Sequence, residues 1–218
     1  MSITLYGASL SPFVRKLRAA LVEKGLEFEQ VQVDPFRPPQ NYRELSPFGR
    51  IPALRDGDRV LADSGVICAY LDAQYPQNAL TPTDPYLKAQ VQWFEKFGDY
   101  ELAPVLTFGV FRNRVLMRFL GKPCDEQHVA SCLTGKMPPL MDYLEANAPE
   151  QGFIVGDRLT IADLAIATHF VNLGHGGEHI DTARWPKSAA YVQRILARPS
   201  IAQSVEQEKA FITKILSR

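Results

Sequence analysis

The chain lacks any long hydrophobic run and any excess of charge of one sign. No stretch of its 218 residues approaches the roughly 20 consecutive apolar residues that a membrane helix needs. Its 24 basic side chains are balanced by 24 acidic ones, so the basic excess typical of nucleic-acid-binding proteins is missing. We therefore expect no membrane and no nucleic acid as partner, and a small molecule or a protein instead.

Cysteine is scarce as well, with only Cys68, Cys124 and Cys132. Their odd number and their spacing fit neither a disulfide framework nor a metal site, so we expect three reduced thiols. Cys68 lies in an apolar helical segment, where a core role is expected. Residues 1–18 also lack the apolar segment and cleavage site of a signal peptide. Together these features predict a cytoplasmic protein.

One stretch near the C-terminus, residues 174–179, combines two histidines and a glutamate with three glycines. Such a composition can suggest a metal site, but zinc sites take four ligands, at least three of them from the protein. The flexible glycines and the absence of further ligands nearby favour a loop. We expect no metal.

Residues 1–74 alternate strand-like and helix-like segments in the order β-α-β-α-β-β-α. A helix between the first two strands implies that these strands are parallel. Asp56-Gly57-Asp58 is a hairpin-turn signal between the last two. The expected strands are around 3–6, 26–33, 53–55 and 59–62, and the expected helices are around 11–25, 41–45 and 64–75.

Residues 75–85 contain three prolines and are typical of a linker, and no convincing strand follows them. The sequence thus predicts an α/β domain at 1–76, a linker at 77–85 and an all-helical domain at 86–218. Pro104 and the pair Pro138-Pro139 should kink or break the helices that contain them. The expected helices are near 86–102, 104–120, 126–147, 160–173, 187–197 and 199–215.

Ser11 directly follows the first strand and begins the first helix, in the segment Ser11-Pro12-Phe13-Val14. A helix N-terminus has unpaired N–H groups and a dipole that favours negative charge. A serine hydroxyl there can donate a hydrogen bond to a thiolate and lower the pKa of the thiol. The same serine could be only an N-cap, and Ser9 could compete for the role. No adjacent histidine makes Ser11 a nucleophile of the hydrolase kind.

Two further segments could bind a ligand. Pro52 stands at the start of the third strand, and a cis peptide before it would expose the backbone of Ile51, although a trans proline is the commoner case. Asp63-Ser64 opens the helix after the fourth strand, where free N–H groups suit a carboxylate and an aspartate suits an ammonium group. That pair could equally be an ordinary helix cap.

Taken in order, these segments resemble those of the cytosolic glutathione transferases, and the resemblance extends over essentially the whole chain. It implies a thioredoxin-like N-terminal domain and an all-helical C-terminal domain. It also implies that Ser11 is catalytic, as in the S-P-F turn of the tau class, whereas the omega class has a cysteine at that place. The glutathione-binding residues that it implies are Ser9, Phe13, Arg37, Arg50, Ile51, Pro52, Asp63 and Ser64.

Within that set, Ile51 before Pro52 matches the residue that pairs with the cysteinyl unit of glutathione. Asp63-Ser64 matches the pair that holds the γ-glutamyl group, and Arg37 could bind the glycyl carboxylate. Thr160-Ile161-Ala162-Asp163 resembles the capping motif of the family's sixth helix, which serves folding and not chemistry.

The resemblance implies a transfer reaction between glutathione and an electrophilic, largely apolar second substrate. Tyr100, Phe108, Phe111 and Arg112 could line the electrophile site, or could equally be helix-packing residues near Pro104. A homodimer is the family's usual state.

Two alternatives remain open at this point. One is another glutathione chemistry, such as peroxide reduction, isomerisation, dehalogenation or thiol–disulfide exchange, the last disfavoured because no cysteine stands at position 11. The other is a non-enzymatic interaction protein, like the stringent starvation protein of bacteria. For that case residues 15–18 could be the docking surface, although a solvated helix face is the stronger expectation.

Overall fold

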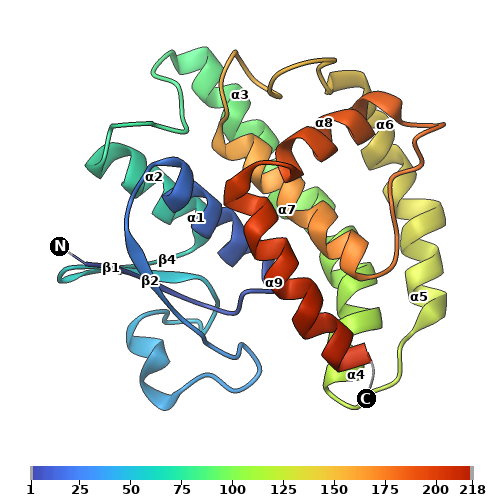
Figure 1. Ribbon diagram of the computed structural model, residues 1–218, viewed down its shortest axis with the longest axis horizontal. Helices are drawn as coiled ribbons and strands as arrows, with labels where there is room; N and C mark the ends of the chain where they lie inside the picture. Colours follow the sequence, from blue (N-terminus) through green and yellow to red (C-terminus); the bar gives the residue numbers. More distant parts are fainter. Residues whose placement is uncertain (1, 217–218) are drawn as a thin grey trace.

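The computed structural model describes residues 2–216. Residue 1 and residues 217–218, which the predicted domain ranges include, lie outside the described part. Figure 1 shows a small sheet on one side of the molecule and a larger helical half on the other. The prediction of an α/β unit followed by an all-helical unit is confirmed.

The sheet has four strands, β1 (Ile3–Tyr6), β2 (Phe28–Val31), β3 (Ala53–Asp56) and β4 (Arg59–Ala62), in the order β2-β1-β3-β4. β1 and β2 are parallel, as predicted, and the other two pairs are antiparallel. β2 is shorter than the expected 26–33. This mixed topology is that of a thioredoxin-like sheet.

Two helices cover one face of the sheet and a short helical turn lies on the other (Figure 1). They are α1 (Pro12–Glu23) and α2 (Ser64–Gln74), and the turn is η1 (Gln40–Glu44). Gly25 takes a φ of 68° just after α1, the left-handed conformation that glycine adopts without a steric penalty. The β1–α1 turn is tight at Gly7, where a Cβ atom would lie 2.4 Å from Cγ2 of Val14.

The helical half is built around α7, which is hydrophobic on nearly every side and therefore buried. Its elements are α3 (Pro85–Lys96), η2 (Phe97–Leu116), α4 (Met117–Phe119), α5 (Glu126–Ser131), η3 (Cys132–Lys136), α6 (Met137–Asn147), α7 (Ile161–His175), α8 (Pro186–Leu196) and α9 (Pro199–Leu216).

Of the kink or break expected at Pro104, the break is wrong, because η2 continues through this residue in wide π-type turns. Such turns shift the hydrogen-bond register by one residue, so the N–H that proline lacks does not end the helix. Pro138 and Pro139 do not interrupt a helix either. They directly follow the wide π-type turns of η3, and α5, η3 and α6 succeed one another without a gap, as around Pro104.

A continuous hydrophobic core runs from the sheet into the helical half, from Leu5 and Leu17 to Leu106 and Leu164. Arg15 and Lys16 lie at the junction and are fully buried. The expectation that residues 15–18 form a solvated face or a docking surface is therefore wrong for these two. Their partners are carboxylates of the second half, which no local pattern reveals.

Candidate active site

The strand register brings the three predicted segments to one end of the sheet. Tyr6, the last residue of β1, pairs with Ala53, the first residue of β3, and Ala53 pairs with Ala62, the last residue of β4. The turn to Ser11, the segment before Ala53 and the start of α2 therefore all leave the same edge. This is the convergence that a thioredoxin-like fold predicts.

Ser11 caps the N-terminus of α1, and its Oγ accepts a long hydrogen bond of 3.4 Å from the N–H of Val14. The hydroxyl proton is thus available for a ligand beside the free N–H groups of the first turn. The turn before it is fixed from the helical half, because Asn172 of α7 donates its amide to the carbonyl of Leu10.

Ser9 differs from Ser11 in being tied to the end of β2. Its Oγ accepts hydrogen bonds from Nε2 of Gln32 at 2.8 Å and from Nε2 of Gln30 at 3.4 Å. It stands in the loop before the helix and not at the helix terminus, so the dipole of α1 is directed at Ser11 and not at Ser9.

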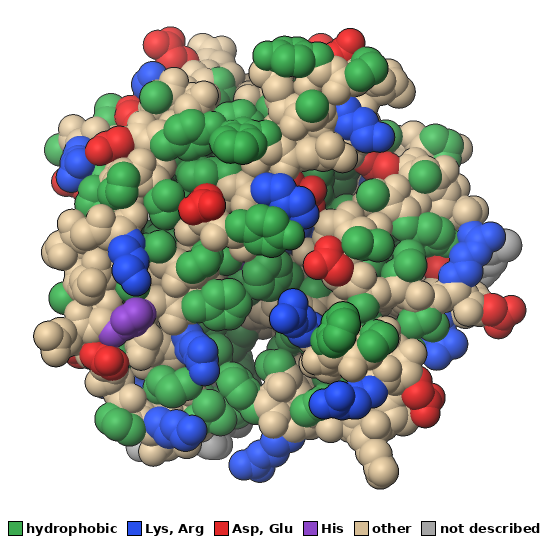
Figure 2. Space-filling model, turned by 180° about the vertical axis from the view of Figure 1, so that it is seen from behind, with side chains coloured by type: hydrophobic (Ala, Val, Ile, Leu, Met, Phe, Trp, Pro, Cys, Tyr) green, Lys and Arg blue, Asp and Glu red, His purple; other side chains and the backbone are tan. Residues whose placement is uncertain are grey.

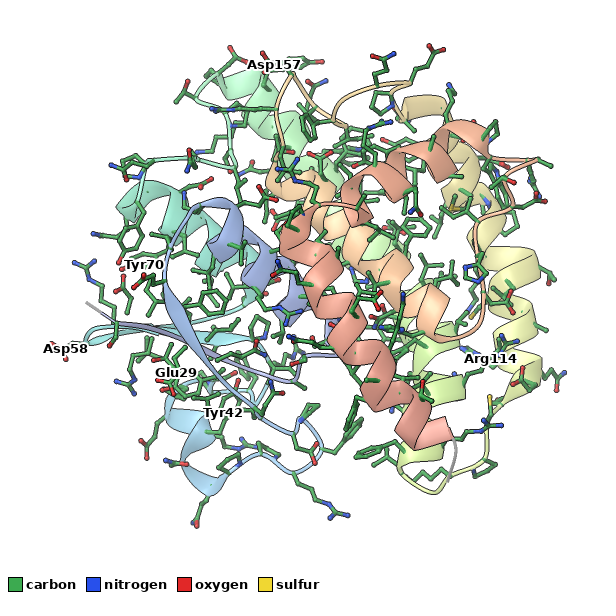
Figure 3. The ribbon with its side chains drawn as sticks, viewed as in Figure 1. Glu29, Tyr42, Asp58, Tyr70, Arg114 and Asp157 are labelled. Atoms are coloured by element: carbon green, nitrogen blue, oxygen red, sulfur yellow. The ribbon has the colours of Figure 1, made fainter. Side chains whose placement is uncertain are left out.

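The Ile51–Pro52 peptide is cis. The segment before it is held by Tyr42, whose hydroxyl donates to the carbonyl of Arg50 at 3.0 Å. Tyr42 lies on η1 (Figure 3), and burial raises its pKa to about 12, so the hydroxyl stays a donor. Sequence reasoning missed this positioning residue, because nothing in the sequence marks one tyrosine of a short helical turn.

Asp63 takes a φ of 79° and a ψ of 127°, which is a sparsely populated conformation for a residue with a side chain. Its Oδ1 accepts the N–H groups of Gly65 at 2.9 Å and of Val66 at 3.2 Å. The side chain is exposed and both of these bonds use Oδ1, and Ser64 beside it is buried. Asp63 therefore is a helix cap that still offers a carboxylate oxygen to a ligand.

A cleft of about 910 Å³ opens between the two halves at Ser11. Figure 2 shows the molecule hollowed on the face opposite to Figure 1, with hydrophobic and basic side chains gathered around the hollow. The predicted residues that line the cleft are Ser9, Ser11, Phe13, Arg50, Ile51, Phe108, Phe111 and Arg112.

Five predicted residues do not line this cleft: Arg37, Pro52, Asp63, Ser64 and Tyr100. Pro52, Asp63 and Ser64 lie at the adjoining strand ends. Tyr100 is 62% exposed, and its ring lies 4.9 Å from Nζ of Lys96, so the structure does not bring it to the apolar wall.

The far wall of the cleft contains residues that sequence reasoning missed, among them Thr107 on η2, Phe119 on α4, and Ser204 and Phe211 on α9. They come from three elements, and the last lies 200 residues beyond Ser11 in the chain. Only the tertiary fold brings them together.

The wall behind Ser11 is a buried ion-pair network. Arg15 pairs with Glu208 and also donates to Asn172 Oδ1 and the carbonyl of Thr168, both at 2.9 Å. Burial by itself raises the pKa of Glu208, but Arg15 and His175 outweigh it and hold that pKa below its usual value. Glu208 therefore is a neutralised carboxylate and not a free acid.

Lys16 forms a second pair, with Nζ 2.5 Å from Oδ2 of Asp99 and 3.1 Å from Oε1 of Glu95. Burial lowers the pKa of Lys16, but the two carboxylates raise it by more, so its pKa lies above the usual value. Because Lys16 is charged and paired on both sides, it fixes α1, and with it Ser11, against the helical half.

His169 lies beside this pair, fully buried behind the cleft. Its Nδ1 is 2.9 Å from Oγ1 of Thr107, a cleft residue, and its Nε2 is 3.8 Å from Oδ1 of Asp99. Burial lowers the pKa of His169, and Lys16 and Arg15 contribute in the same direction. The imidazole is therefore neutral near pH 7.

The stretch 174–179 is helical in part, because Gly174 and His175 end α7, and only the remainder is a loop. His175 lies 3.0 Å from Oε2 of Glu208. Within residues 2–216, no three His, Cys, Asp or Glu side chains are grouped as a metal site would require. In the same part of the chain, no helix is both long and apolar enough to cross a membrane.

The cysteines are free, as expected. Cys68 is 7% exposed, and burial raises the pKa of its thiol above the usual value, so it is a poor nucleophile. The capping motif at Thr160 is also confirmed, because the N–H of Thr160 donates to Oδ2 of Asp163 at 2.8 Å.

A thioredoxin-like sheet joined to an all-helical half, with a cleft between them, is the fold of the glutathione transferase class. A family model described as "Glutathione S-transferase, N-terminal domain" matches residues 5–79, and one described as "Glutathione S-transferase, C-terminal domain" matches residues 113–208. A glutathione S-transferase of Hyoscyamus muticus is 31% identical over 96% of this chain and 100% of its own length. The chain belongs to the glutathione S-transferase family.

Two further proteins are similar over nearly the whole chain. Protein LigF of a Sphingobium strain is 29% identical and covers 96% of this chain and 95% of its own length. A solved glutathione S-transferase of Methylobacterium radiotolerans, in complex with glutathione sulfonate, has a TM-score of 0.76 at 27% identity. It covers 94% of this chain and 95% of its own.

Proposed function

We propose that the protein is a glutathione transferase in which Ser11 activates the thiol of glutathione. The observation that carries the proposal is the position of Ser11, whose hydroxyl caps α1 and lines a large cleft with a mainly apolar wall. The hydroxyl and the free N–H groups of α1 stabilise the thiolate, which lowers the pKa of the bound thiol. The thiolate then attacks an electrophilic, largely apolar substrate in the cleft.

The residues around Ser11 suit the rest of the glutathione molecule. In this proposal the backbone of Ile51, before the cis bond, pairs with the cysteinyl unit. The second carboxylate oxygen of Asp63 suits the ammonium of the γ-glutamyl group, and the start of α2 at Ser64 suits its carboxylate. Arg50, at the cleft, and Arg37, outside it, are the basic side chains for the glycyl carboxylate.

The test compares Ser11→Ala with Ser9→Ala, a matched change of the same residue type in the same cleft. The pKa of bound glutathione is measured by the ultraviolet absorbance of its thiolate. We expect Ser11→Ala to raise that pKa and to lower kcat by about 10- to 1000-fold, with Ser9→Ala near wild type. An unchanged pKa in Ser11→Ala would refute the role of Ser11, and a loss in Ser9→Ala instead would transfer it to that residue.

For the alternative of a non-enzymatic partner protein, Arg15 and Lys16 are not available as a docking surface, since both are buried in ion pairs. A homodimer remains part of the proposal. It is supported by large side chains exposed on α2 and α3, with Val66, Tyr86 and Trp93 between 52% and 71% exposed. Sedimentation equilibrium gives the mass in solution, and a monomer at micromolar concentration would contradict the dimer.

A further inference from the structure

The cleft of the described structure contains four charged side chains, Asp34, Arg50, Arg112 and Glu208. Glu208 is neutralised by Arg15 and His175, and Asp34 accepts the N–H of Phe36 at 2.8 Å. Arg50 lies next to Ile51, on the side proposed for glutathione. Arg112 and Glu208 stand on the opposite, helical wall, and of these two only Arg112 carries a positive charge.

The guanidinium of Arg112 is exposed, and no hydrogen bond or ion pair joins it to any side chain that the structure describes. Its neighbour Arg114, by contrast, pairs with Glu126 and Glu178. An unpaired cation on an apolar wall favours anionic ligands and disfavours cationic ones.

The wall around Arg112 is unusually rich in phenylalanine. Phe108, Phe119 and Phe211 line the cleft from the helical half and Phe36 lines it from the other, and all four are between 41% and 48% exposed. Phe119 pairs with Phe211 at 6.3 Å between ring centroids, and Phe108 pairs with Phe13 of α1 at 6.4 Å. A flat aromatic ring that enters the cleft would cover these faces and gain both buried area and aromatic contacts.

Arg112 follows Phe108 by one helical turn, so the cation stands beside the aromatic wall on the same side of η2. We propose that the second substrate is an aromatic electrophile that bears a carboxylate, with its ring among the phenylalanines and its carboxylate on Arg112. The planar guanidinium fork matches a carboxylate in a two-bond geometry. This inference rests on the proposed function, because it names the substrate class of the same cleft.

The reaction step is a substitution on the ring. The thiolate sulfur of glutathione forms a bond to a ring carbon, and a leaving group such as chloride departs with the electron pair of its broken bond. The thiol proton goes to solvent, and no oxidant or reductant is required.

The experiment uses a matched pair of electrophiles, a chlorodinitrobenzoate with chlorine para to the carboxylate and the corresponding neutral amide. Each kcat/KM is divided by the rate of the uncatalysed reaction with glutathione, which removes the difference in ring reactivity. Wild type should prefer the benzoate, and Arg112→Gln should lose about tenfold of that preference, because kcat/KM falls by more for the benzoate than for the amide. Arg112→Lys should retain part of it, since charge remains but the fork is lost.

Arg118→Gln is the matched control, an exposed arginine on the following helix α4 that does not line the cleft. It should leave the preference unchanged. Equal preference in wild type and Arg112→Gln would overturn the proposal. A rise in KM for glutathione in Arg112→Gln, with the preference intact, would also overturn it, because Arg112 would then bind the glycyl carboxylate.

A binding measurement separates this proposal from the proposed function. Calorimetry with unreactive dinitrobenzoate and dinitrobenzamide reports the carboxylate contact without any turnover. Tighter binding of the benzoate, lost in Arg112→Gln, supports the inference even if no conjugation occurs and the proposed function fails. If both electrophiles are conjugated and the benzoate and the benzamide bind with equal affinity, the proposed glutathione transferase function is supported and the carboxylate inference is refuted.

Discussion

Arg15 on α1 and Glu208 on α9 form a buried ion pair between residues 193 positions apart in the chain. The side chain of Arg15 is 0% exposed and that of Glu208 is 2% exposed. The pair holds the helix that begins at Ser11 against the last helix of the molecule, next to the cleft. The site and the stability of the domain contact are therefore coupled.

Replacing Arg15 with methionine should leave Glu208 as a buried carboxylate without its main partner. We expect a loss of about 3–5 kcal/mol in the free energy of unfolding, measured by urea denaturation. Arg18→Met is the control, because Arg18 is on the same helix but lies 3.5 Å from Glu208 and is partly exposed. Arg18→Met should reduce the free energy of unfolding by less than about 1 kcal/mol. Equal losses for the two variants would contradict the role of Arg15 as the main partner of Glu208.

His169 should make the protein less stable in mild acid. Its pKa is lowered in the folded state, so the unfolded chain binds a proton first as the pH falls through 6.5. The contribution of His169 to the free energy of unfolding is therefore at its maximum above pH 6.5. It decreases as the pH drops under 6.5, by up to about 1.4 kcal/mol per pH unit.

The measurement is urea denaturation between pH 7.5 and about 5, above the range in which most carboxylates titrate. His169→Gln should be less stable than wild type at pH 7.5, but its free energy of unfolding should decline less steeply as the pH falls. His179→Gln, a change of an exposed histidine, should keep the decline of wild type. A decline of equal slope in His169→Gln would show that other groups cause it.

Asp63→Asn tests the γ-glutamyl contact apart from the cap. The amide oxygen can still accept the N–H groups of Gly65 and Val66, and asparagine tolerates a positive φ. Stability should therefore change little, while the lost charge raises KM for glutathione about tenfold. The pKa of the bound thiol should be that of wild type, the reverse of Ser11→Ala. An unchanged KM would remove Asp63 from the glutathione site.

Substitution of Asp163 should reduce the free energy of unfolding by more than substitution at most other positions of the helical half. It accepts four hydrogen bonds, from the N–H of Ile154, the N–H and hydroxyl of Thr160, and the hydroxyl of Tyr191. Asp163→Ala should cost about 3 kcal/mol or more in thermal or urea unfolding, because several buried donors lose their acceptor. Tyr191→Phe removes one of the four bonds and should cost about 1 kcal/mol. Similar small losses for both would contradict a shared network.

Local signals predicted the sheet half well. The order of elements, the parallel first pair of strands and the turn at Gly57 follow from short-range patterns that tertiary contacts did not override. The sheet edge at which Ser11, Ile51 and Asp63 meet follows from that order, so most of the side proposed for glutathione could be predicted from the sequence.

The helical side of the cleft could not be predicted from the sequence, for a physical reason. Arg15 and Lys16 follow the helical pattern of exposed cations, and only carboxylates 79 to 193 residues away make their burial possible. Phe119 and Phe211 contribute to the cleft through the packing of α4 on α9, which depends on the path of η2 through Pro104. Of the two roles expected for Tyr100, the electrophile site or helix packing, the position outside the cleft favours the second. The phase of a helix with wide turns is not encoded in a simple period of 3.6 residues.

The two cations of α1 also restrict how this molecule can be recombined. An α/β unit grafted onto a helical half that lacks carboxylates at the places of Glu208, Asp99 and Glu95 would bury Arg15 and Lys16 without partners. The two halves are thus not interchangeable modules, although each matches a separate family model. In a chimera, α1, α3, the start of η2 and α9 should therefore come from the same parent. These four segments carry the ion pairs and have to be exchanged together, although the linker separates the first from the other three.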